Sequence, residues 1–140
     1  MLVSDDDIRK ILNETKVIAL VGWSPKVERP SHGVANFLVG GGFRVIPVNP
    51  GQEGLVTLWG EVVRGSLSAI DLPVDMIDIF RNSAAVPPVV DEALRHFPGL
   101  KCIWMQLGVV HEGAAAKARA AGVAVVMDRC PAIEIPRLFR

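Results

Sequence analysis

Side chains that could bind an anion follow an apolar run near the start of the chain: Ser24, Lys26, Arg29, Ser31 and His32. The run itself, residues 17–21, stops at Gly22, and a short apolar run closed by turn residues predicts a strand buried on both faces. Residues 34–38 have helical character, so the polar loop precedes a helix N-terminus. Free backbone N–H groups and the helix dipole favour an anion at such a junction. The segment therefore predicts a site for an anionic, nucleotide-like ligand.

The loop lacks the two common nucleotide-binding fingerprints. Only Gly22 stands at the strand end and Gly33 comes much later, so G-x-G-x-x-G is missing, and no G-x-x-x-x-G-K-[ST] P-loop occurs. A NAD site also needs a carboxylate after the second strand to hold the ribose hydroxyls. Here the strand at 44–48 is followed by Asn49 and Pro50. An acid would repel a phosphate on the ribose, so its absence suits a ribose-phosphorylated ligand, whose phosphates the basic loop side chains would neutralise.

Strands and helices alternate along the chain. Strands are predicted at residues 17–21, 44–48, 74–80, 102–106 and 123–127, and helices after Ser4 and over 34–40, 83–97 and 112–121. Strands separated by helices imply a parallel sheet with right-handed crossovers. We therefore expect an α/β fold with a mainly parallel sheet of about five strands.

Local residue patterns refine these boundaries. Ser4 followed by three aspartates is typical of a helix start, which we favour over a metal cluster. Ser83 is predicted to cap the third helix, whose Pro87 and Pro88 must then fall in its first turn. Residues 52–70 are less periodic, with short extended pieces and a helical turn near 66–70, and we expect only a short tail after residue 127.

The predicted carboxyl ends of the strands share a distinctive composition. Gly, Pro, amide and arginine residues are frequent at 22–31, 49–51, 80–82, 106–108 and 129–130. These ends meet at one edge of a parallel sheet, where ligands bind in open α/β folds. The asymmetry supports a binding site at that edge.

Bulk composition fits one small domain, residues 1–140, with a cytoplasmic location. Half of the 140 residues are hydrophobic and the mean hydropathy is +0.35, as buried parallel strands require. The formal net charge is zero, so we expect no nucleic acid as partner. No apolar run approaches the roughly 20 residues that cross a bilayer, and no signal peptide is recognisable. The two cysteines form no C-x-x-C pair, so we expect free, reduced thiols.

Five stretches of the chain, in order, resemble a known family: VGWSPKVERPSHGV, GFRVIPVNPG, VDMIDIFRNS, WMQLGV and VMDRCPAIE. They are similar to the small stand-alone CoA-binding proteins, and to the CoA-binding domain of the succinyl-CoA synthetase alpha subunit and of NDP-forming acyl-CoA synthetases. The resemblance extends from about residue 15 to residue 138. It implies a Rossmann-like, three-layer α/β/α domain that holds coenzyme A or an acyl-CoA at the carboxyl ends of the strands.

The resemblance also assigns residues to parts of the ligand. It implies contacts to the phosphates from Gly22, Ser24, Pro25, Lys26, Arg29 and Ser31. It implies contacts to the adenosine from Val48, Asn49 and Pro50, to the nucleotide from Phe80 and Arg81, and to the pantetheine from Gln106 and Gly108. Trp23 stands where the family holds a smaller residue, and we expect its bulk to narrow the site.

Each of these residues has a plainer interpretation. Lys26 and Arg29 are equally compatible with solvated loop charges, and Arg81 with an ion pair to Asp78. Asn49 and Gln106 could satisfy loop backbone groups. Two residues of the fourth strand (Trp104 and Met105) and Cys102 are expected in the core, and the three histidines are too scattered to indicate a metal site.

Two functions from different classes stay open. The first, which we favour, is a non-catalytic binding module for CoA or an acyl-CoA, because no catalytic constellation is recognisable in the sequence. The second is an NAD(P)-binding or thiol-redox protein that uses Cys130, since Arg129 beside it would favour a thiolate at the ligand edge. The sequence identifies no protein partner and no acyl group.

Overall fold

A computed structural model describes residues 3–139 and contains one parallel sheet of five strands. The strands are β1 (Val17–Val21), β2 (Arg44–Val48), β3 (Met76–Ile79), β4 (Cys102–Met105) and β5 (Ala124–Val126), in the spatial order β2-β1-β3-β4-β5. All four neighbouring pairs are parallel, which confirms the predicted α/β architecture. The last three strands are one to three residues shorter than predicted.

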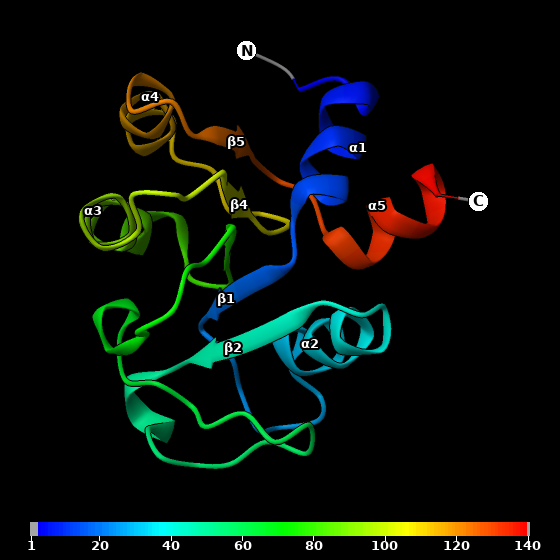
Figure 1. The fold of residues 1–140 in the computed structure, drawn as a ribbon, viewed down its shortest axis with the longest axis vertical. Helices are drawn as coiled ribbons and strands as arrows, with labels where there is room; N and C mark the ends of the chain where they lie inside the picture. Colours follow the sequence, from blue (N-terminus) through cyan, green and yellow to red (C-terminus); the bar gives the residue numbers. More distant parts are fainter. Residues whose placement is uncertain (1–2, 140) are drawn as a thin grey trace.

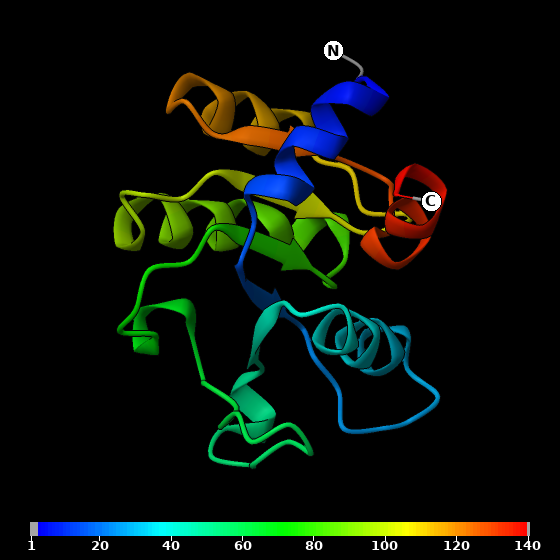
Figure 2. The same cartoon turned by 45° about the vertical axis from the view of Figure 1, so that its right-hand side comes forward.

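Helices cover both faces of the sheet (Figures 1 and 2). They are α1 (Asp5–Glu14), α2 (Pro30–Gly40), α3 (Val86–His96), α4 (Glu112–Ala120) and α5 (Pro131–Leu138). Helices α3 and α4 pack in one apolar cluster with one face, and α1, α2 and α5 pack in a second cluster with the other. Successive strand residues point to opposite faces, and both faces are covered, so the strands are mostly apolar, with Asp78 of β3 as a buried exception. The fold is therefore a three-layer, Rossmann-like α/β/α arrangement.

The first helix starts as its sequence predicts. The Ser4 hydroxyl accepts from the Asp7 N–H at 3.1 Å, and the Asp7 carboxylate accepts from the Ser4 N–H at 3.2 Å, a reciprocal capping box. Burial of Ile8 and Leu12 fixes the inner face of α1. The aspartates at the start of this helix therefore serve its N-terminus.

Two other helix starts differ from the prediction. Helix α2 begins at Pro30 rather than near residue 34, because proline is well tolerated in a first turn, so Ser31 lies in the helix and not in the loop. Helix α3 begins at Val86 and keeps its two prolines in the first turn, as expected. Asn82, not Ser83, caps the preceding turn, since its side-chain oxygen accepts from the Ala85 N–H at 3.1 Å.

The expected tail after β5 was wrong, because it forms helix α5. Pro131 and Pro136 suggest irregular structure, but Pro131 occupies the tolerated first position of the helix. Ile135 and Leu138 pack against the buried cluster shared by α1 and α2. Tertiary packing therefore stabilises a helix that local propensity disfavours.

The less periodic segment after β2 folds back over the β2 edge of the sheet. It carries bridges between Val48 and Arg64 and between Val56 and Val62, and the Trp59 indole N–H donates to the Val45 carbonyl at 3.0 Å. A short 3-10 turn at Leu67–Ala69 matches the predicted helical turn. No helix in residues 3–139 is long and apolar enough to cross a membrane.

Candidate ligand-binding site at the carboxyl edge of the sheet

A pocket of about 560 Å³ opens at the carboxyl ends of the strands. The chain leaves β1 toward β2 on one side and returns to β3 on the other, and a crevice forms where the strand order changes direction. Nine of the residues predicted for the ligand line this pocket: Gly22, Ser24, Lys26, Arg29, Ser31, Asn49, Phe80, Arg81 and Gln106. The topology thus brings together side chains from four strand ends.

Gly22 permits the close approach of two strand ends at the base of the pocket. Its φ of +90° is disfavoured for residues with a side chain. A Cβ at this position would lie 2.6 Å from the Phe80 carbonyl oxygen and 3.3 Å from Cδ of Arg81. Glycine is therefore required both by the backbone conformation and by the neighbouring strand end.

Hydroxyl groups hold the loop between β1 and α2 in shape. The Ser24 N–H donates to Ser31 Oγ at 3.0 Å, and the Lys26 N–H donates to Ser24 Oγ at 3.1 Å. Nδ1 of His32 lies 3.2 Å from the Ser24 carbonyl oxygen. Both serine hydroxyls accept from the loop's own backbone, and each keeps its O–H as a donor for a ligand.

The pocket carries three basic side chains and no acidic one. Lys26, Arg29 and Arg81 are exposed, and within residues 3–139 none of them forms an ion pair. No Asp or Glu lines the pocket. Arg29 occupies the N-cap of α2 without a side-chain cap bond, so first-turn N–H groups of that helix add positive potential at the same place. The arrangement suits a ligand with several phosphate charges.

Two side-chain amides at the pocket differ in whether their polar atoms already have hydrogen-bond partners. The Asn49 side chain donates to the Trp23 carbonyl at 2.7 Å and accepts from the Gly51 N–H at 2.9 Å, which confirms its structural interpretation. Gln106 is only 5% exposed, and its Oε1 has no partner within residues 3–139. A buried polar atom without a partner is costly, so Gln106 is free to bond a ligand group in the pocket.

Five other residues predicted for the ligand lie outside the pocket lining: Trp23, Pro25, Val48, Pro50 and Gly108. The expectation that Trp23 narrows the site was wrong. Its ring is 2% exposed and packs in the core, with ring centroids 6.1 Å from both His32 and Trp59. Val48 is buried in β2 and packs in the apolar cluster that includes α3 and α4. The Gly108 N–H donates to Asp128 Oδ1 at 2.7 Å.

Four lining residues were not assigned to the ligand from the sequence, although two of them lie in segments predicted at this edge: Pro30, Val34, Leu107 and Val109. Val34 lies one helical turn after Pro30, where α2 begins. A prediction that started the helix at Pro30 would therefore have placed Val34 at the pocket. Leu107 and Val109 flank a glycine with φ of +78°, a turn signal that does not reveal which side chains face inward.

Comparisons with known proteins agree with this geometry. A sequence profile described as "CoA binding domain" matches residues 16–136. The chain belongs to this CoA-binding domain family. It is 35% identical over 127 residues to the uncharacterized protein YneT of Bacillus subtilis, which covers 91% of this chain and 90% of that protein.

Two solved structures extend the likeness over the whole fold. The cell-free protein ID.343 from Thermus thermophilus has a TM-score of 0.90 and 36% identity, covering 98% of this chain and 100% of that one. A hypothetical protein from Pyrococcus horikoshii also has a TM-score of 0.90 and 36% identity, covering 99% and 94%. The predicted family and its Rossmann-like fold are therefore confirmed.

The proposed ion pair between Arg81 and Asp78 does not exist in this member of the CoA-binding domain family. Asp78 is fully buried in β3, and neither of its carboxyl oxygens has a hydrogen-bond partner within residues 3–139. Burial raises the pKa of the Asp78 carboxyl well above its usual range. Arg81 thus keeps its charge for the pocket, as the third cation there.

The two cysteines are both free but lie in different environments. Cys102 is fully buried in β4, where burial and the neighbouring Asp78 raise the pKa of its thiol. Cys130 is 6% exposed, lines the pocket and stands at the N-cap of α5. Only Cys130 therefore faces the space where a ligand would bind.

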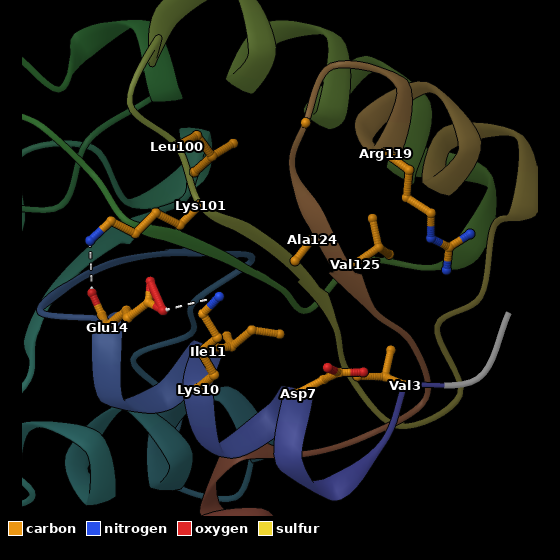
Figure 3. Close-up of a pocket in the computed structure, with 11 residues that line it drawn as sticks. Val3, Asp7, Lys10, Ile11, Glu14, Leu100, Lys101, Arg119, Ala124 and Val125 are labelled. Atoms are coloured by element: carbon orange, nitrogen blue, oxygen red, sulfur yellow. Dashed lines mark hydrogen bonds and ion pairs between the residues drawn. The ribbon is translucent and has the colours of Figure 1, made fainter.

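A second pocket of about 520 Å³ lies at the opposite, amino edge of the sheet, between α1 and β5 (Figure 3). Its lysines have acidic partners: Lys10 Nζ is 3.9 Å from Glu14 Oε1, and Lys101 Nζ is 3.5 Å from Asp75 Oδ1. Lys101 also donates to the Glu14 carbonyl at 3.0 Å. Asp7 and Glu14 line this pocket together with Lys10, Lys101 and Arg119, and of these three cations only Arg119 forms no ion pair within residues 3–139.

Proposed function

We propose that this protein binds coenzyme A in the pocket at the carboxyl edge of the sheet, as a module without chemistry of its own. The observation that carries the proposal is the set of three cations, Lys26, Arg29 and Arg81, which line one pocket with no acidic neighbour in it. Coenzyme A carries a diphosphate and a ribose phosphate, and charge-assisted hydrogen bonds from such cations bind phosphates well. Membership of the CoA-binding domain family supports the same ligand.

The end of β2 favours CoA over NAD. The residue after this strand is Asn49, whose side chain is already bonded to backbone groups, and no carboxylate stands there to hold free ribose hydroxyls. A cationic rather than acidic surrounding suits a phosphorylated ribose. NADP also carries a ribose phosphate, so it is the sharper competitor in a binding test.

A binding role is favoured because the pocket offers little that can move a proton. Its lining contains no carboxylate and no histidine, and its ionisable nucleophiles are Cys130 and Lys26, of which Lys26 is assigned to the phosphates. The apolar side chains of Val34, Leu107 and Val109 provide surface for the pantetheine arm or a short acyl group. Both thiols are free, in keeping with a cytoplasmic protein.

Thermal unfolding with matched ligands tests the proposal. CoA at a hundredfold excess over its Kd should stabilise the protein by about 2.7 kcal/mol, because a ligand that binds only the native state shifts unfolding by mass action. Dephospho-CoA should give a smaller shift, and NAD none. Acetyl-CoA, measured in parallel, shows whether an acyl group is accepted. A shift with NAD or NADP and none with CoA would overturn the assignment.

A further inference from the structure

We infer that Cys130 is a site of covalent modification, where thiol–disulfide exchange joins it to the pantetheine thiol of coenzyme A. The inference rests on the proposed function, because it requires the ligand to lie in the same pocket. It adds a redox state to what would otherwise be simple binding. Cys130 is the only cysteine that lines the pocket described by residues 3–139.

The pocket connects the cationic loop with Cys130. Lys26 and Arg29 follow β1 and Cys130 follows β5, and in the sheet order these strands are three spacings apart, about 14 Å at ~4.8 Å per spacing. A ligand held by its phosphates at the loop can cross this distance only with an extended arm. The pantetheine arm of CoA is such a chain, and its far end is a thiol.

A second side chain in the pocket indicates that something polar occupies this path. Gln106 directly follows β4, between the loop and Cys130 in strand order, and its buried Oε1 has no partner within residues 3–139. A buried acceptor without a donor is normally satisfied by a ligand or water. The pantetheine arm contains amide N–H groups that could donate to it, so Gln106 supports the same course for the arm.

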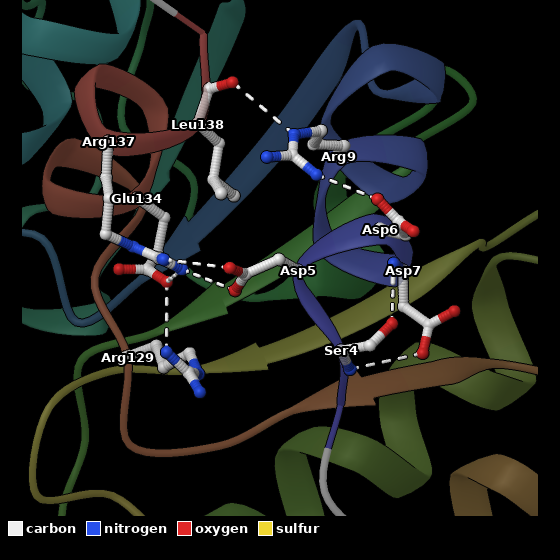
Figure 4. Close-up of polar contacts among 9 residues, drawn as sticks. All are labelled: Ser4, Asp5, Asp6, Asp7, Arg9, Arg129, Glu134, Arg137 and Leu138. Atoms are coloured by element: carbon white, nitrogen blue, oxygen red, sulfur yellow. Dashed lines mark hydrogen bonds and ion pairs between the residues drawn. The ribbon is translucent and has the colours of Figure 1, made fainter.

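Polar contacts hold Arg129 and Glu134, the residues on either side of the start of α5 (Figure 4). The buried Glu134 accepts from Arg129 at 3.0 Å and from Arg137 at 2.8 Å, and Arg137 also binds Asp5 of α1 at 2.7 Å. The Trp104 indole donates to the Arg129 carbonyl at 2.9 Å. These contacts fix the start of α5, so the thiol keeps its place in the pocket.

The same contacts correct the expectation that Arg129 activates the thiol. Its guanidinium is bound to Glu134 and is not a free cation beside the sulfur. Proximity is therefore what makes the reaction selective for CoA. A CoA disulfide that is bound through its nucleotide is present at a high effective concentration next to Cys130. Arg129 acts on Cys130 only by positioning the start of α5.

The co-reactant is coenzyme A disulfide, the oxidised dimer of CoA. The Cys130 thiolate attacks one of its sulfurs, the S–S bond of the dimer breaks, and a Cys130–S–S–CoA bond forms. The other CoA leaves as a thiolate and takes up the proton that Cys130 has lost. A dithiol reductant reverses the modification and releases the CoA.

The experiment exposes the full, reduced chain to CoA disulfide and measures intact mass over time. We expect one CoA added per chain and its loss with dithiothreitol. Trypsin cleaves after Lys101 and Arg129, which puts the two cysteines on separate peptides, so mapping on the wild type locates the adduct without any variant. Cys130→Ser should abolish the adduct, and Cys102→Ala should keep it. An adduct on Cys102, or none, overturns the inference.

Two comparisons separate a guided reaction from ordinary thiol reactivity. Glutathione disulfide has no nucleotide, and at equal concentration it should react with Cys130 roughly tenfold more slowly or worse. The double variant Lys26→Ala/Arg29→Ala should slow the reaction with CoA disulfide at least about tenfold and slow that with glutathione disulfide much less. Equal rates for both disulfides in the wild type would overturn the inference.

Binding of reduced CoA to the wild type in dithiothreitol distinguishes the two proposals. If CoA binds there but CoA disulfide gives no adduct, the covalent step is wrong and the proposed function stands. If CoA does not bind in dithiothreitol, the proposed function itself fails.

Discussion

The two ends of the sheet carry pockets of nearly equal size, about 560 Å³ at the carboxyl edge and 520 Å³ at the amino edge, yet only the first is suited to a phosphate ligand. Both contain basic side chains. At the amino edge Lys10 and Lys101 have carboxylate partners and only Arg119 is unpaired, whereas within residues 3–139 none of the three cations at the carboxyl edge has such a partner. Available charge, rather than pocket volume, therefore separates the two ends.

Backbone orientation reinforces this difference. The first-turn N–H groups of α2 lie at the carboxyl edge, and the loop before that helix is closed by serine hydroxyls. At the amino edge the corresponding groups are already used, since the Asp75 carboxylate accepts from the Lys16 and Val17 N–H groups at 2.9 Å each. One end thus presents unused donors, whereas at the other end carboxylates already pair most of the basic groups.

The largest expected effect concerns the cations. The double variant Lys26→Ala/Arg29→Ala should weaken CoA binding by roughly 1–3 kcal/mol for each lost charge-assisted hydrogen bond, measured by calorimetry. The matched control is Lys10→Ala/Lys101→Ala, which removes the same charge at the amino edge and should change CoA affinity by less than about 0.5 kcal/mol. Equal losses in the two double variants would show that only overall charge matters.

A smaller effect is expected from backbone geometry. Gly22→Ala should destabilise the protein by about 3 kcal/mol and weaken CoA binding, because a Cβ there would meet the Phe80 carbonyl at 2.6 Å. Gly42 has a similar φ of +94° but open space around its Cβ direction. Gly42→Ala should therefore cost only about 1 kcal/mol and leave CoA affinity unchanged. Chemical denaturation of both variants measures the difference, and equal costs would refute the close-contact argument.

The remaining effects depend on pH and concern two acids, Asp75 directly before β3 and Asp78 within it. Burial raises the pKa of Asp78, so its native form holds a proton that the unfolded chain releases above about pH 4. Stability is then lost as pH rises, by up to about 1.4 kcal/mol per pH unit. Asp78→Asn should remove this dependence and be more stable than the wild type at pH 7. The free energies of unfolding of the two proteins should converge near pH 4.

The contribution of Asp75 to stability should depend on pH in the opposite direction. Its partial burial opposes ionisation, but hydrogen bonds from the Val17 and Lys16 N–H groups and the nearby Lys101 ammonium outweigh burial and lower its pKa. Its contribution to stability is present above the unfolded pKa and is lost as pH falls below about 4. Asp75→Asn should therefore weaken the protein at neutral pH. Urea unfolding at a series of pH values tests both variants, and a common slope would contradict the assignment.

Local patterns were enough to predict much of the fold. The apolar runs, the capping sequence at Ser4 and the proline pair in α3 each act within a few residues, so their structural meaning can be read directly. Helix α5 was missed because its stability comes from contacts of Ile135 and Leu138 with α1 and α2, which are far away in the sequence. Trp23 was misplaced for the same reason, since its partners Trp59 and His32 come from other elements.

The sequence by itself determined the alternation of the five strands with the first four helices along the chain, the glycine at the end of β1, the basic loop and the lack of an acid after β2. Each of these is a property of neighbouring residues. Only the tertiary structure decided which charges stay unpaired and which thiol reaches the pocket. Arg137 binds Asp5 across 132 positions of sequence, whereas Arg81 lies close in sequence to Asp78 and forms no pair with it. Pairing depends on the direction of each side chain from the sheet and on burial, and these follow from how distant elements pack.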